Sequence, residues 1–169
     1  NAYICSIPLD FEKVPLHWHD EVVIIYIKKG RGRITLDFTS LYVEAGDIII
    51  VSPGQLHAIG PAEYSMEYEN IIFSLDLLCT GSMDALSSEF FEPFLAGTIG
   101  FEHLVCCDDE HYPVLSSCLN HIDSISSSFP KGYRLAIKGA LFTFFYTIFT
   151  NSTDIPAPKN DPHIERLKS

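Results

Sequence analysis

The sequence predicts a mainly β domain followed by a pair of helices. Between residues 3 and 106, short apolar stretches are separated by Gly or Pro turns about every 8–12 residues, the pattern of a small β-barrel or sandwich. Residues 111–128 and 133–150 instead repeat apolar side chains at helical spacing. Pro130 interrupts the chain between these two stretches, so we expect a helical hairpin after the β part.

Composition sets the limits for function. The chain has 169 residues, of which 47% are apolar, enough for one domain with a sizeable core. Its net charge of −11 argues against direct binding of nucleic acid or an anionic membrane. The five cysteines form no CxxC pair, so we expect no disulfide framework and a cytoplasmic location. We see no signal peptide and no apolar run long enough to span a bilayer.

The first half of the chain carries the clearest strand signals. Residues 3–14 indicate an edge strand with a lead-in loop, and residues 17–28 a firm strand. The β-branched run from Val22 to Ile27 is nearly continuous, which is typical of a strand buried on both faces. Residues 28–32 (Lys-Lys-Gly-Arg-Gly) predict a turn. A second strand is expected at 33–38, with Ile34, Leu36 and Phe38 on one face.

Further strands are expected at 41–44, 48–51, 57–59 and 64–75. The last of these should present Tyr64, Met66, Tyr68 and Asn70 on one face, and Glu67 and Glu69 on a solvated one. Residues 79–100 are expected to form a loop-rich crossover, followed by a final strand at 102–106.

The two predicted helices differ in their apolar faces. The helix at 111–128 is apolar on one side, but the helix at 133–150 is apolar around nearly its whole circumference. Such a helix must be buried on all sides. We therefore predict a homodimer interface on the second helix, with burial inside one chain as the open alternative. The residues expected to form that interface are Leu141, Phe142, Phe145 and Phe149.

Three histidines are the best candidates for a site. His17 and His19 are two residues apart, so in a strand they face the same side. His57 follows the Pro53-Gly54 turn and can meet them from a neighbouring strand. A neutral imidazole offers one donor and one acceptor, which suits the hydroxyls and carbonyls of a small polar ligand. The alternative is that these rings only bond barrel carbonyls.

These motifs resemble those of the AraC family of bacterial transcription regulators. The resemblance covers nearly the whole chain, and its most specific segment is the Gly-Asp…Pro-Gly-Gln-x-His run at residues 46–57. The other matching segments are His17-x-His19, Gly30, residues 69–73 and residues 132–142.

The resemblance implies a cupin-like barrel (a double-stranded β-helix or jelly roll) at 1–106, which senses an effector. It implies a dimerising antiparallel helical hairpin at 107–151. Residues 152–169 would then be a linker and the start of a missing helix-turn-helix domain, through which alone the protein would contact DNA. We interpret the chain as a piece of a longer protein.

The resemblance also implies a set of pocket residues. Lys29 corresponds to a sugar-contacting Arg of the family's arabinose sensor, and Arg33 is a second candidate for that cationic role. Tyr68 and Asn70 match positions that present pocket side chains in that sensor. The implied effector is a sugar or a similar polar metabolite, and the implied partners include no membrane.

A metal is the alternative occupant of the three histidines. Metal-binding cupins place a Glu a few residues after the His-x-His pair, but Val23 stands in that phase here, and Glu21 comes one step too early. Three histidines can still hold zinc with an open position. We expect no cofactor and no enzyme, and keep a metal-dependent isomerase or dioxygenase using His17, His19 and His57 as the alternative.

Overall fold

The computed structural model describes residues 2–7, 13–60, 65–79 and 85–156. The strands are β1 Ala2–Ile7, β2 Val14–His17, β3 Val22–Leu36, β4 Thr39–Glu44, β5 Ile48–Val51, β6 His57–Ile59, β7 Met66–Phe73, β8 Ile99–Gly100, β9 Leu104–Val105 and β10 Thr153–Asp154. The helices are a 3-10 turn at Leu75–Leu77, a π-helical turn at Ser87–Phe91, α1 Glu92–Leu95, α2 Tyr112–Ser128 and α3 Tyr133–Thr150.

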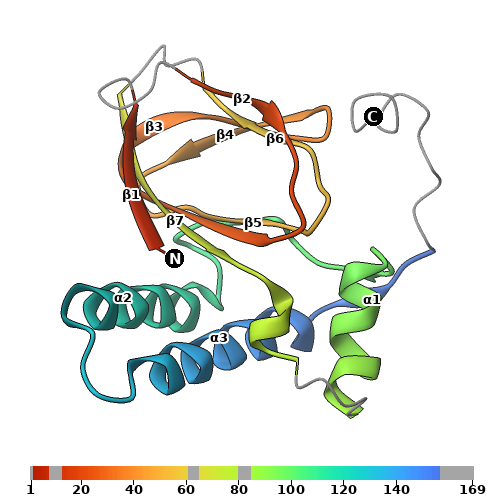
Figure 1. The fold of residues 1–169 in the computed structure, drawn as a ribbon. Coiled ribbons are helices and arrows are strands. Elements are labelled where there is room, and N and C mark those ends of the chain that lie inside the picture. Colours follow the sequence, from red (N-terminus) through yellow and green to blue (C-terminus); the bar gives the residue numbers. More distant parts are fainter. Residues whose placement is uncertain (1, 8–12, 61–64, 80–84, 157–169) are drawn as a thin grey trace.

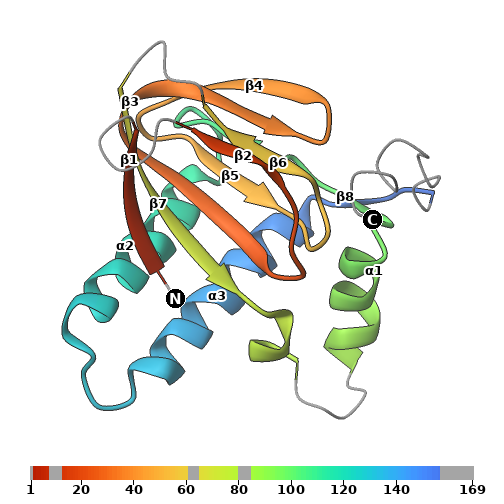
Figure 2. The same cartoon turned by 45° about the horizontal axis from the view of Figure 1, so that its top comes forward.

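The elements form three layers. One sheet runs in the order β1-β7-β3-β5-β9, and β2, β6 and β4 form the opposite wall with the far half of β3. Helices α2 and α3 lie against the outer side of the first sheet, below β5 and β7 in Figure 1. The turned view in Figure 2 shows the same order of β walls and helices. The prediction of a mainly β barrel followed by an antiparallel helical hairpin is confirmed.

Strand β3 belongs to both walls, which corrects the predicted turn at 28–32. Residues 22–30 pair with β7 and residues 23–26 also with β5, whereas Arg31 onward pairs with β4 and residues from Ile34 also with β6. The register shifts between Ile27 and Lys29, as in a β-bulge that bends a strand from one sheet into another. Gly30 permits this because its φ is 75° and a Cβ there would lie 1.9 Å from the carbonyl oxygen of Ser65.

The bulge changes which side chains face inward. Before it, the odd-numbered Val23, Ile25 and Ile27 point into the barrel, and after it the even-numbered Ile34 and Leu36 do so. Phe38 was predicted to share the face of Ile34 and Leu36, but this is wrong. Strand β3 ends at Leu36, Asp37 adopts a φ of 51°, and Phe38 is 59% exposed.

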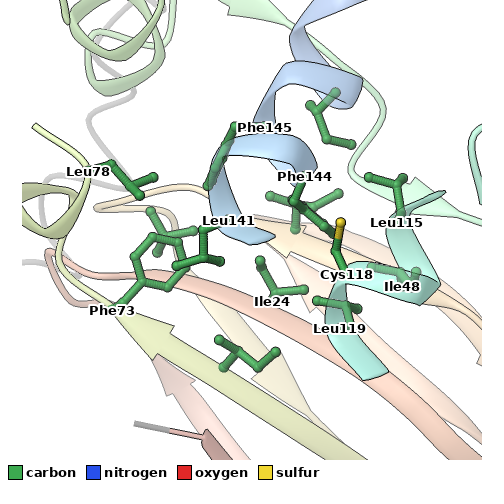
Figure 3. Packing of buried hydrophobic residues seen from close by; sticks show 14 of the residues in the cluster. Ile24, Ile48, Phe73, Leu78, Leu115, Cys118, Leu119, Leu141, Phe144 and Phe145 are labelled. Carbon is green, nitrogen blue, oxygen red and sulfur yellow. The ribbon is translucent and has the colours of Figure 1, made fainter. Parts of the chain in front are cut away.

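Two apolar layers result. The inner layer lies between the two walls of the barrel and includes Val23, Ile25, Ile27, Ile34, Leu36, Val43, Ile49, Val51, Ile59, Met66 and Tyr68. The outer layer lies between the first sheet and the helices. Figure 3 shows part of it, with Ile24, Ile48 and Phe73 of the strands facing Leu115, Cys118, Leu119, Leu141, Phe144 and Phe145 of the helices. Because Val22–Ile27 alternates between these layers, the prediction of a strand buried on both faces is confirmed.

Helix α3 is buried mainly inside the chain, which corrects the predicted interface residues. Leu141, Phe145 and Phe149 are only 1–6% exposed, and Phe142 is half-buried. Aromatic partners of Phe145 and Phe149 come from residues 85–100, which fold into the π-helical turn and α1 within the stretch predicted as an irregular crossover. Phe149 stacks on Phe90 with ring centroids 5.8 Å apart, and Phe145 meets Phe94 at 5.7 Å. The alternative of burial within one chain is the one observed for Leu141, Phe145 and Phe149.

The remaining predictions concern the element bounds, the undescribed residues and a membrane span. The helix bounds are confirmed within one residue, and the last strand of the barrel is shorter than predicted, at Leu104–Val105. Tyr64 and the tail from residue 157 lie outside the described residues. No helix in the described part of the chain combines the length and apolarity that crossing a membrane requires.

Candidate functional site

The three histidines meet at one end of the barrel interior. His17 in β2 pairs directly with His57 in β6, so both rings leave neighbouring strands at the same level. The turn at 52–55 fixes His57, because Ser52 N–H donates to Gln55 Oε1 at 3.1 Å. The same turn holds His19, since Gly54 N–H donates to the His19 carbonyl at 2.8 Å. The predicted meeting of His17, His19 and His57 is therefore what the structure shows.

The rings are close enough to share one ligand. The centroid of His57 lies 4.2 Å from that of His17 and 5.0 Å from that of His19, and His17 and His19 are 5.7 Å apart. One ring nitrogen of each histidine lies within 4.8 Å of the others. An atom placed among them can contact all three residues.

Each histidine uses its Nδ1 on the surrounding chain. His17 Nδ1 lies 2.8 Å from the carbonyl oxygen of Pro15, and His57 Nδ1 lies 3.0 Å from that of Gln55. His19 Nδ1 lies 3.3 Å from Glu21 Oε2, an ion-pair distance without an aligned hydrogen bond. The nitrogen left for a ligand is therefore Nε2 in His17 and His57, and the nearby Glu21 carboxylate favours the same arrangement in His19. Such outer partners fix the orientation of a ligating histidine.

Burial keeps His57 uncharged. His57 is 3% exposed, and this burial, reinforced by the proximity of His17 and His19, lowers its pKa from 6.5 to about 4. The hydrogen bond to the Gln55 carbonyl and the negative charge of Asp37 oppose the shift without reversing it. His57 is a neutral imidazole at pH 7, able to bind through a lone pair.

The sequence signature of the AraC-like ligand binding domain matches residues 9–143. The chain belongs to this family. The match spans both the strands that carry the three histidines and most of the helical hairpin.

Individual relatives match this chain over different lengths. An uncharacterized HTH-type transcriptional regulator of Escherichia coli (strain K12), YdiP, is 51% identical over 45 residues, which are 25% of this chain and 14% of that protein. The crystal structure of the AraC-like transcriptional activator CuxR superimposes with a TM-score of 0.55 at 8% identity, covering 89% of this chain and 49% of CuxR. That likeness shows the fold. A cupin protein from Bacteroides fragilis aligns with a TM-score of 0.40 at 25% identity over 50% of this chain and 69% of its own.

Two more predicted residues of this AraC-like domain line the barrel interior. Tyr68 is fully buried in the inner layer, opposite Ile27, and Asn70 stands on the same face, opposite Ile25. The buried Oδ1 of Asn70 has no hydrogen-bond partner among the described residues. Val23 also faces inward and is 2% exposed, so an apolar side chain occupies the phase in which metal-binding cupins place their acid.

The two predicted cationic residues lie outside this interior. Lys29 is 75% exposed and pairs with Glu67, 3.1 Å away, on the outer face of β7. Arg33 lies over the ring of Tyr42, 5.3 Å from its centroid, and Tyr42 is 74% exposed. Both positions would have faced inward in an unbroken strand, but the bulge between Ile27 and Lys29 turns them outward. The structure therefore gives neither residue contact with the histidines.

Residues that support the site were not all visible in the sequence. Glu21 was considered only as a failed metal ligand, yet its carboxylate orients His19 from outside the cluster. The side chain of Gln55 also receives a role, because its Nε2 donates to Asp37 Oδ2 at 3.1 Å and ties the turn before His57 to the end of β3. The Pro-Gly-Gln-x-His spacing was the one local signal that pointed to Gln55.

Proposed function

We propose that this AraC-like domain is the effector sensor of a cytoplasmic transcription regulator and binds a small polar, sugar-like metabolite in its barrel. The observation that carries the proposal is the convergence of His17, His19 and His57 at one end of the interior, with one ring nitrogen of each within 4.8 Å of the others. Tyr68 and Asn70 add polar groups to an otherwise aliphatic wall, as ligand pockets require. DNA contact would belong to a separate domain of the full protein.

A thermal-shift screen against sugars, polyols and amino sugars tests the proposal. A ligand that binds only the folded state raises Tm, and at 100 times Kd it adds about 2.7 kcal/mol. The shift should disappear in His57→Ala and persist in Asp20→Asn, because Asp20 is exposed and lies outside the cluster. An effector whose shift survived His57→Ala would place the binding site elsewhere.

A metal ion is a second candidate, favoured by the three converging histidine nitrogens. Three imidazoles leave an open position in a tetrahedral zinc site, and outer partners on Nδ1 are typical of metal-ligating histidines. Val23 offers no carboxylate as a fourth protein ligand, so the fourth position of the metal stays open. Under this proposal an effector binds the metal at that position. Stoichiometric zinc, cobalt or nickel that survives dialysis, and that is lost in His57→Ala, would support it. Turnover of a substrate by the metal-loaded protein would favour the enzyme alternative.

We also propose that the domain forms a homodimer through the outward face of α3. Leu135 and Tyr146 are 78% and 72% exposed, and the half-buried Phe142 lies between them at helical spacing. Sedimentation of Tyr146→Glu should show monomers with an unchanged circular dichroism spectrum. Ser124→Glu, on the exposed side of α2, is the matched control and should remain dimeric. Dimers of both variants would contradict this interface.

A further inference from the structure

The hydrogen-bond partners of the histidine cluster fix where its protons lie. The carbonyl oxygens of Pro15 and Gln55 can only accept, so Nδ1 of His17 and of His57 carries the hydrogen. A neutral imidazole has one N–H, which leaves a lone pair on Nε2. The carboxylate of Glu21, 3.3 Å from His19 Nδ1, favours the same tautomer in His19.

The cluster is therefore electron-rich in the direction of its ligand. One ring nitrogen of each histidine lies within 4.8 Å of the others. In neutral rings with the hydrogen on Nδ1, the nitrogens open to a ligand present lone pairs. The basic side chains that could offset this polarity are engaged elsewhere. Lys28 pairs with Glu69, Lys29 pairs with Glu67 and Arg33 stacks on Tyr42, all on the outer faces of the strands. An anion entering the cluster would meet lone pairs, and none of Lys28, Lys29 and Arg33 would compensate them.

We propose that this cluster binds only groups that accept an electron pair, namely O–H and N–H donors or a metal ion, and rejects carboxylates and phosphates. Glu21 is the positioning residue that sets this polarity at His19. This inference rests on the proposed function, which supplies the ligand, and it narrows the chemical class of that ligand. A neutral polyol, an amine or a divalent metal fits, whereas a sugar acid or a sugar phosphate fits only if its anionic group lies away from the histidines.

The tautomers are measurable without any ligand. Long-range ¹H–¹⁵N spectra of the purified chain distinguish protonated from unprotonated ring nitrogens, and we expect Nδ1–H with bare Nε2 in all three histidines. Glu21→Gln replaces an obligatory acceptor by an amide that both donates and accepts. His19 should then lose its pure Nδ1–H pattern while His17 and His57 keep theirs. Asp20→Asn, the exposed neighbour, should change none of them. Protonated Nε2 in two or more rings of the wild type would overturn the proposal.

Ligand probes test the selectivity itself. Xylitol, ethanolamine and Zn²⁺ are titrated separately, and acetate and inorganic phosphate serve as anionic counterparts at the same concentrations. We expect at least one of the first three to shift the Nε2 signals and neither anion to do so. Binding of xylitol or ethanolamine would identify a hydrogen-bond donor as the occupant, whereas binding of Zn²⁺ would identify a metal ion. Glu21→Gln should weaken the effective probe about tenfold, the usual effect of losing an outer partner.

The outcomes separate this inference from the proposed function. If acetate or phosphate shifts Nε2 more than every donor probe does, a ligand site exists and its polarity is the reverse of that proposed. If the tautomers are as expected, no probe binds and no effector emerges from the thermal screen, the barrel site itself fails while the assigned polarity stands. Equal affinities in Glu21→Gln and wild type would remove Glu21 from the positioning role.

Discussion

The inner and outer layers of this AraC-like domain share strand β3 but differ in how they hold polar groups. The outer layer joins aromatic rings of α3, α1 and the π-helical turn, and the buried carboxylate of Glu69 faces Lys28 at 3.3 Å. The inner layer is aliphatic and ends in three imidazoles, with one ring nitrogen of each within 4.8 Å of the others. A charge-paired layer serves cohesion, whereas polar groups left open inside a barrel are typical of a binding site.

The comparison predicts that aromatic deletions in the outer layer have the largest effect on stability. Phe145 is 1% exposed and meets Phe73, Phe91, Phe94 and Phe149, with ring centroids 5.4–6.1 Å apart. Phe145→Ala should lower the free energy of unfolding by about 3–5 kcal/mol, from lost burial and the cavity left behind. Urea denaturation measures this. Tyr146→Ala, the exposed neighbour, should change it by about 0.5 kcal/mol or less. Similar losses in both variants would mean that α3 does not pack as described.

The bulge that separates the two walls should be the next most sensitive point. Gly30→Ala places a Cβ 1.9 Å from the Ser65 carbonyl oxygen at a φ of 75°. We expect a loss of about 1–3 kcal/mol, from backbone strain and displacement of the chain before β7. Gly139→Ala is the matched control, because nothing lies within 4 Å of its added methyl group in mid-helix. That variant should gain about 0.5–1 kcal/mol. An equal gain at Gly30 would show that β3 is not bent there.

The same bulge marks the limit of what the sequence could predict. Periodicity identified the strands, the two helices and the two-residue spacing that brings His17 and His19 together. It could not reveal that Lys-Lys-Gly-Arg-Gly continues a strand, because the close approach of Ser65 to Gly30 is a contact between distant segments. The resemblance alone suggested Lys29 and Arg33 as pocket residues, and the bulge that turns both side chains outward was not visible in the sequence. Similarly, the apolar circumference of α3 suggested a partner chain, because residues 79–100 gave no strong helical signal.

The histidine end of the inner layer should matter little for stability. His57 and Ile59 lie on the same strand and the same inward face, both 3% exposed. Ile59→Ala should cost about 2–5 kcal/mol, as for other buried aliphatic side chains. His57→Leu, of similar size, should change the free energy of unfolding by about 1 kcal/mol or less, because it removes a buried polar ring with an open Nε2. Urea denaturation compares the two variants. A loss at His57→Leu as large as that at Ile59→Ala would make the cluster structural.

The smallest effect concerns the charge of the outer layer and appears as a pH dependence. Glu69 was predicted to be solvated but is 0% exposed. Burial, assisted by the nearby Asp123, raises the pKa of its carboxyl above 4.5, and Lys28 opposes the shift only in part. The folded protein therefore holds this proton more tightly than the unfolded chain does. As pH rises from 4.5 through the raised pKa, the unfolded state loses its proton first, and the contribution of Glu69 to stability falls.

Glu69→Gln should remove this falling component. The stability of the variant minus that of the wild type should increase with pH from about 4.5 upward and level off once the wild-type carboxyl is ionised. The loss of the Lys28 partner adds an offset to this difference, whereas its change with pH comes from the Glu69 carboxyl. The slope is therefore the diagnostic quantity in urea denaturation from pH 4 to pH 7. Glu67→Gln, on the same face with its side chain 34% exposed, should give a nearly flat difference. A difference for Glu69→Gln that fell with pH would mean that Lys28 stabilises the Glu69 carboxylate by more than burial penalises it, and that the outer layer favours this charge.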